Sequence, residues 1–180
     1  MEYIESQLRQ LIGSIIRMEK MQEKQAQQYL KKANSLEVIT IILLVCIIGA
    51  TISNIFVDNF WLKVASAVLA GLGLFISTYL KSHDLKGAYQ KCRETDMLLL
   101  HLKEDTVSSI CDIKSEILDK KEAKEKRNEY QKIYLEICKN APEVKKIIGK
   151  KVQKEMNHLQ DNTFSNGQID SYLPAELRKS

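Results

Sequence analysis

"VITIILLVCIIGATISNIFV", residues 38–57, decides the fold of this 180-residue chain, because it contains no charged side chain. At about 1.5 Å of rise per residue, a helix of this length crosses the hydrocarbon core of a bilayer, which is about 30 Å thick. A helix buried in a soluble bundle normally has a polar face, whereas the only polar residues here are Thr, Ser, Asn and Cys. The stretch therefore predicts a membrane span and argues against the alternative, a core helix of a soluble domain.

A second apolar run follows at residues 64–80, and it reaches spanning length if it begins at Phe60. Trp61 is then expected at the lipid headgroups, with Lys63 extending its ammonium toward them. Between the runs, "NIFVDNFWLK", residues 54–63, is too short for an external domain. The sequence therefore predicts a hairpin of two antiparallel spans, at about 38–57 and 60–80.

Cations flank the two spans, and only Lys63 of the 27 Lys and Arg residues lies between residues 38 and 80. Those that follow the second span, which we also expect to contact anionic headgroups, are Lys81, Lys86, Lys91 and Arg93. Five more precede the first span, namely Arg17, Lys20, Lys24, Lys31 and Lys32. The positive-inside rule therefore predicts that both termini are cytoplasmic.

The rest of the chain is expected to form a cytoplasmic helical bundle, so the predicted fold is all-α with a two-span membrane hairpin. Residues 1–35 form an amphipathic helix, 36–81 the hairpin, 82–156 a helical region and 157–180 a polar, mobile tail. One face of the first helix carries apolar residues at spacings of four and three: Ile4, Leu8, Leu11, Ile15 and Met18. A second such face comprises Leu99, Leu102, Ile110, Ile113 and Ile117.

Residues 88–141 contain neither Gly nor Pro, so they form either one long helix or two helices. The charged run "DKKEAKEKRNE", residues 119–129, favours a break or hairpin near that point. A later segment, "EVKKIIGKKVQKEM" at residues 143–156, can form a short helix after Pro142.

No group of residues has the spacing of a catalytic, cofactor or metal site. The three His residues are scattered, and the four Cys residues are too widely spaced for a disulfide framework, so we expect reduced thiols. The basic run from Lys120 to Arg127 is interleaved with Glu122 and Glu125, which is typical of a solvated helix face and not of a nucleic-acid site.

Small and polar residues form a stripe along each predicted span. The first stripe comprises Thr40, Thr51, Asn54 and Asp58, and the second comprises Lys63, Ser66, Ala70, Gly73 and Ser77. Such stripes either allow close packing of helices or line a water-filled path shared among several hairpins, since two helices cannot enclose a path. In the second case Asn54, Asp58 and Lys63 would form the outer mouth.

Two further segments carry a resemblance to a known family. They are "YLKSHDLKGAYQKCRETDMLLLHLKED", residues 79–105, and "KRNEYQKIYLEICKNAPEV", residues 126–144. With the N-terminal helix and the short-turned hairpin, they resemble the SLATT family of bacterial two-span effectors, which are associated with nucleotide-signalling and defence systems.

This resemblance implies a non-enzymatic effector in the bacterial inner membrane. It would oligomerise and permeabilise the bilayer when triggered from the cytoplasmic side, by a soluble signal-sensing or nucleotide-synthesising partner. The alternative is a membrane-anchored adaptor whose cytoplasmic helices recruit a soluble partner. A proton-coupled transporter is disfavoured, because the spans contain no internal Asp or Glu.

Overall fold

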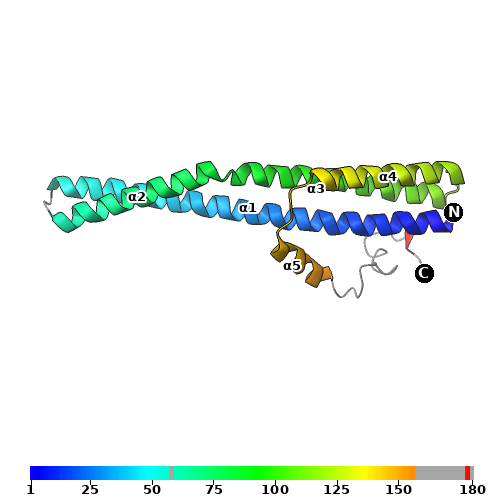
Figure 1. Ribbon diagram of the computed structural model, residues 1–180, viewed down its shortest axis with the longest axis horizontal. Coiled ribbons are helices and arrows are strands. Elements are labelled where there is room, and N and C mark those ends of the chain that lie inside the picture. The colour runs from blue at the N-terminus through cyan, green and yellow to red at the C-terminus, as the bar shows by residue number, and fades with distance from the viewer. Residues whose placement is uncertain (57–58, 157–176, 179–180) are drawn as a thin grey trace. The chain divides into compact units, whose positions relative to one another are not determined.

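The computed structural model describes residues 1–56, 59–156 and 177–178, and their regular structure is helical apart from turns (Figure 1). The helices are α1 (Glu2–Phe56), α2 (Phe60–Ser82), α3 (Leu85–Lys114), α4 (Lys120–Asn140) and α5 (Lys146–Met156). Two of them have segments long and apolar enough to cross a membrane, which confirms the predicted all-α fold with two membrane helices.

The chain divides into two compact units. The hairpin unit comprises residues 27–89, and the bundle unit comprises residues 1–26 and 90–180. Helix α1 contributes to both, since it runs without interruption from the amphipathic N-terminal segment through the first predicted span. The expected mobile tail, residues 157–180, lies outside the described residues except for Leu177 and Arg178.

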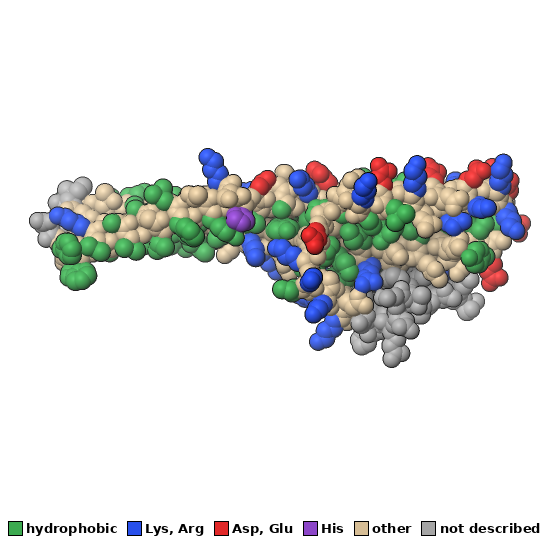
Figure 2. Space-filling model, in the orientation of Figure 1, with side chains coloured by type: hydrophobic (Ala, Val, Ile, Leu, Met, Phe, Trp, Pro, Cys, Tyr) green, Lys and Arg blue, Asp and Glu red, His purple; other side chains and the backbone are tan. Residues whose placement is uncertain are grey.

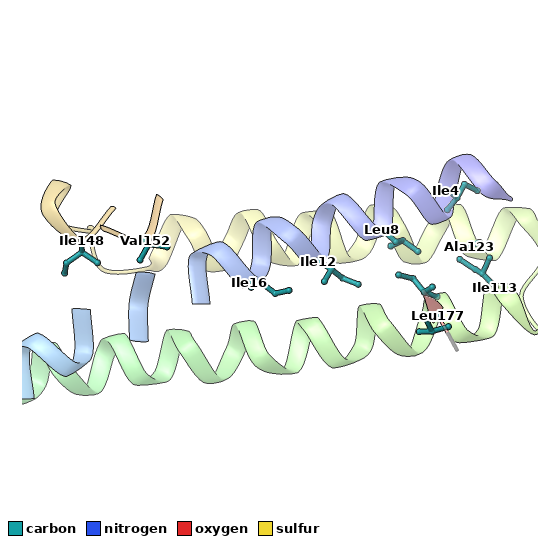
Figure 3. Close-up of a cluster of buried hydrophobic side chains, with 10 residues drawn as sticks. Ile4, Leu8, Ile12, Ile16, Ile113, Ala123, Ile148, Val152 and Leu177 are labelled. Carbon is teal, nitrogen blue, oxygen red and sulfur yellow. The ribbon is translucent and has the colours of Figure 1, made fainter. Parts of the chain in front are cut away.

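A continuous cluster of buried apolar side chains forms the larger core of the bundle unit (Figure 3). Its members on α1 are Ile4, Leu8, Ile12 and Ile16, which are at most 7% exposed. The cluster continues through Ile110, Ile113, Ala123, Ile148, Val152 and Leu177. Residues from α3, α4, α5 and the C-terminal segment thus pack around α1.

A second cluster in the same unit joins Ile15 of α1 to Leu99 and Leu102 of α3. Leu11, Met18 and three side chains of α4 are partly buried around it. The predicted α1 stripe, which included Leu11 and Ile15, therefore captures only part of the buried surface. A second stripe, Ile12 and Ile16, is buried as well, because helices pack against α1 on more than one side.

The predicted α3 face is correct for four of its five residues, but Ile117 is 71% exposed. The reason is that α3 ends at Lys114, before Ile117 is reached. The amide of Ile117 donates to the carbonyl of Asp112 at 3.0 Å, and that of Glu116 donates to Ile113 at 3.2 Å. These bonds form a Schellman motif with Glu116 in the left-handed region, at φ 56°.

The chain then reverses direction. Residues 88–141 therefore form two helices, α3 and α4, and not one long helix. Asp119 begins α4 with a capping box, since its carboxylate accepts from the amides of Lys121 and Glu122, both at 2.7 Å. Helices α3 and α4 are antiparallel, as shown by the hydrogen bond between the hydroxyls of Ser109 and Tyr130 at 2.9 Å. The break precedes the charged run instead of falling inside it.

Two buried glutamines of α1 bind the connection between α4 and α5. The Gln25 amide donates to the Glu143 carbonyl at 2.8 Å and accepts from the Lys145 amide at 2.9 Å. Gln22 donates to the carbonyl of Pro142 at 3.0 Å. These polar residues therefore satisfy backbone groups of the non-helical segment between α4 and α5.

Candidate functional site

The hairpin unit exposes its apolar surface instead of burying it (Figure 2). Between residues 38 and 82, no side chain that the structure describes is buried. Large side chains such as Ile41, Val45 and Phe75 are 61–70% exposed. Exposure of so large an apolar surface to water is unfavourable. The surface is therefore suited to contact with lipid.

The two helices of this unit pack along a regular seam. Partly buried residues recur at spacings of four and three: Leu36, Thr40, Leu43, Ile47, Ala50 and Asn54 on α1, and Leu62, Ser66, Leu69, Gly73, Ile76 and Leu80 on α2. This spacing is that of a two-helix coiled coil. Eight of these twelve residues are apolar positions that the sequence stripes left out, although the spacing itself was present in the sequence.

Three contacts define the antiparallel register of the seam. Asn54 Nδ2 donates to Ser66 Oγ at 3.2 Å near the turn. A Cβ added at Gly73 would lie 3.4 Å from the Ile47 side chain in the middle. Lys86 Nζ lies 2.5 Å from Glu37 Oε1 at the far end. Residue numbers increase along α1 as they decrease along α2, so the two spans are antiparallel. Of the predicted stripe residues, Thr40, Asn54, Ser66 and Gly73 lie in this seam, and Ala70 is partly buried next to it.

The remaining members of the predicted stripes do not share that position. Thr51, Lys63 and Ser77 are exposed, and Asp58 lies outside the described residues. Residue 51 lies on the outer side of α1 because it comes one position after Ala50, which is in the seam. Each predicted stripe is thus divided between the contact surface of the two spans and the outer surface of the hairpin.

Most hydroxyls of the spans are satisfied within their own helix. Thr51 donates to the Ile47 carbonyl at 2.8 Å, and Thr78 donates to the Leu74 carbonyl at 2.8 Å. Thr40 and Ser66 do the same. The Ser77 hydroxyl differs, because it has no hydrogen-bond partner among the residues that the structure describes. A group of this kind seeks a partner outside the chain when lipid surrounds it.

The turn between the spans is closed by a helix cap and flanked by aromatic residues. Asn59 accepts from the Trp61 amide at 2.9 Å and so begins α2. The rings of Phe60 and Trp61 meet edge to face at 5.9 Å, and both side chains are more than 70% exposed. This is the arrangement expected of aromatic residues at a membrane interface.

The cations expected at the cytoplasmic headgroups fall into two groups. All four side chains are exposed. Lys86 also pairs with Glu37, and Arg93 lies 2.5 Å from Asp96. Two of the four cations therefore have protein carboxylates as partners.

Asp96 is the most buried carboxylate near this level of the bundle unit, at 8% exposure. Its burial, together with the nearby carboxylates of Glu19 and Glu23, raises its pKa against the opposing effect of Arg93 and Lys103. Lys103 in turn contacts both carboxylate oxygens of Glu19 at 3.1 Å. These carboxylates and cations form a candidate structural ion cluster.

Titratable groups provide no arrangement for chemistry within the described ranges. No set of three or more His, Cys, Asp or Glu residues there could hold a metal ion. The four cysteines are free thiols, as expected, and burial raises the pKa of Cys92. Tyr134 also has a raised pKa, because it is buried and lies beside Cys138.

The fold and its exposed hairpin define a two-span membrane protein with a helical bundle. Residues 4–168 match the model of SMODS and SLOG-associating 2TM effector domain family 4, so the chain belongs to the SLATT family of two-transmembrane effector domains. This family is not a known family of enzymes. Comparisons with curated proteins and with solved structures give no match.

Proposed function

We propose that this effector acts by oligomerising in the bacterial inner membrane, where several hairpins surround a conducting path. The observation that carries the proposal is Ser77, a span hydroxyl that is exposed and lacks a partner in the described part of the chain. Lys63 lies on the same stripe and is also exposed. Because Ser77 lies outside the seam between α1 and α2, its hydroxyl is available to neighbouring hairpins or to water.

The trigger is expected on the cytoplasmic side. Helix α1 ends at Phe56 and α2 begins at Phe60, which leaves no length for an external sensing domain, and the bundle unit is the other folded part of the chain that the structure describes. A soluble signal-sensing or nucleotide-synthesising protein of an antiviral defence system would shift the effector toward its conducting oligomer. In this arrangement both termini are cytoplasmic. Maleimide labelling of a single added cysteine at residue 1, compared between intact and opened cells, tests the position of the N-terminus.

Dye release from vesicles tests the proposed pore. Full-length protein, reconstituted at increasing protein-to-lipid ratio, is expected to release a trapped fluorophore. Ser77→Leu should reduce the release at least tenfold, because it places an apolar side chain on the proposed polar surface. Thr78→Leu is the matched control, since the Thr78 hydroxyl is exposed but already bonds to its own helix. Vesicles that stay intact at every ratio and in the presence of cell extract would refute the pore.

A membrane-anchored adaptor is the second candidate, and one observation favours it. Met97 and Leu98 on α3 and Leu135 on α4 are 46–59% exposed in the bundle unit, where a soluble partner could cover them. An adaptor would keep its function when residues 38–80 are replaced by an unrelated two-span hairpin. The pore-forming effector would lose its function in the same exchange.

A further inference from the structure

A polar groove of about 340 Å³ lies between α1 and α4 within the bundle unit. This volume is at the lower end of the range of small-molecule sites, which extends from about 300 to 1,000 Å³. Two leucines contribute to its walls. The polar side chains that line it are Gln7, Gln10, Ser14, Arg127, Gln131 and Tyr134.

Two atoms of these side chains are buried without a hydrogen bond. They are Nε of Arg127, a donor, and Oε1 of Gln7, an acceptor. Among the residues that the structure describes, none forms an ion pair or hydrogen bond with the Arg127 guanidinium. Buried polar atoms are nearly always satisfied, and an unsatisfied pair of opposite kind in one groove therefore indicates a missing polar partner.

Other polar groups of the groove already have partners. The Ser14 hydroxyl donates to the Gln10 carbonyl at 3.2 Å, and the Tyr134 hydroxyl donates to the Ser14 carbonyl at 3.4 Å. Arg127 is the single charged residue among the described lining residues, so its positive charge has no carboxylate to balance it there. Lys126 and Arg127 are the partly buried cations of the basic run, but Lys126 pairs with Asp112 at 3.6 Å.

We propose that the groove binds a small ligand that carries an oxyanion, either a phosphate or a carboxylate. The anionic oxygens would accept from the guanidinium of Arg127, whose planar fork matches both groups. A hydroxyl or amine of the ligand would donate to Oε1 of Gln7. The site belongs to the bundle unit alone and does not depend on pore formation.

Equilibrium dialysis tests this site with the full-length protein in uncharged detergent. Radiolabelled glycerol 3-phosphate and malate serve as separate probes, since each combines an oxyanion with hydroxyl donors. At least one probe should bind saturably, at about one molecule per chain. The probe that binds identifies the oxyanion as phosphate or carboxylate.

Arg127→Gln should weaken the binding at least tenfold, because it removes the charge-assisted hydrogen bonds. Lys132→Gln, an exposed change on the same helix, should leave the affinity within about twofold of wild type. Thermal unfolding without probe controls for folding, and Arg127→Gln should not lower the midpoint, since Arg127 has no partner to lose. Lack of saturable binding of either probe, or equal affinities of wild type and Arg127→Gln, would overturn the proposal. Neither result depends on dye release.

Discussion

The two units use apolar side chains in opposite ways. In the bundle unit α3 buries nine residues, several of them polar, and the visible face of this unit carries many charged side chains (Figure 2). In the hairpin unit α2 buries none, although it is the more apolar helix. The difference shows that helix periodicity alone does not define a core. The surroundings, water in one case and lipid in the other, decide which face of a helix is its outside.

The largest expected effect is the loss of folding stability when a leucine is shortened to alanine, which should differ between the two units. Leu8→Ala should destabilise the bundle by about 3 kcal/mol, because it leaves a cavity at a fully buried position. Leu44→Ala, at a position that is 53% exposed in the hairpin, should cost less than about 0.5 kcal/mol. Thermal unfolding by circular dichroism in uncharged detergent measures both. Equal losses would mean that the outer face of the hairpin is packed against protein.

A medium effect is expected at the seam of the hairpin. Gly73→Leu should cost about 1–3 kcal/mol, since the new side chain would meet Ile47. Gly71→Leu is the matched control, because a Cβ there has nothing within 4 Å. The same unfolding measurement distinguishes them. If Gly71→Leu were as harmful as Gly73→Leu, the seam would not be the contact surface that the structure shows.

The smallest effect concerns Asp96 and depends on pH. Its pKa in the folded protein is raised above the ordinary value of 3.8, so the carboxylate lowers stability at neutral pH. That loss is relieved as pH falls through the folded pKa. Asp96→Asn should therefore raise the unfolding midpoint at pH 7 by about 2 °C, and the gain should shrink toward about pH 4. A loss of stability at pH 7 that shrinks on acidification would show instead that the ion pair with Arg93 dominates.

Much of the fold followed from the sequence because the signals were strong and local. Twenty residues without charge, from 38 to 57, predict a span wherever they occur. The charged run from Asp119 marked a break in the helical region, and Pro142 marked the end of a helix. The bounds of α4, Lys120–Asn140, agree with both signals. The exact break before Asp119 was harder to place, because Glu116 adopts a left-handed conformation that usually belongs to Gly.

The candidate sites were less accessible to sequence reasoning. The spacing of three and four residues from Lys63 to Ser77 predicted a single stripe on the second span. The structure places Gly73 of this stripe inside the seam and Ser77 outside it. Small differences in helix phase accumulate over three turns, and only a packed partner fixes which face is inward. The groove at Arg127 was missed for another reason, since its residues come from helices that are more than a hundred positions apart in sequence.

The sequence by itself determined the all-α class, the two spans and the family, because each depends on composition and order along the chain. Only the tertiary structure decided which polar groups remain without a partner. Whether Arg127 lies on a solvated face or in a groove, and whether the Ser77 hydroxyl points to a neighbouring helix or away from it, depends on contacts between segments distant in sequence. Burial is a property of that packing, and no local pattern contains it.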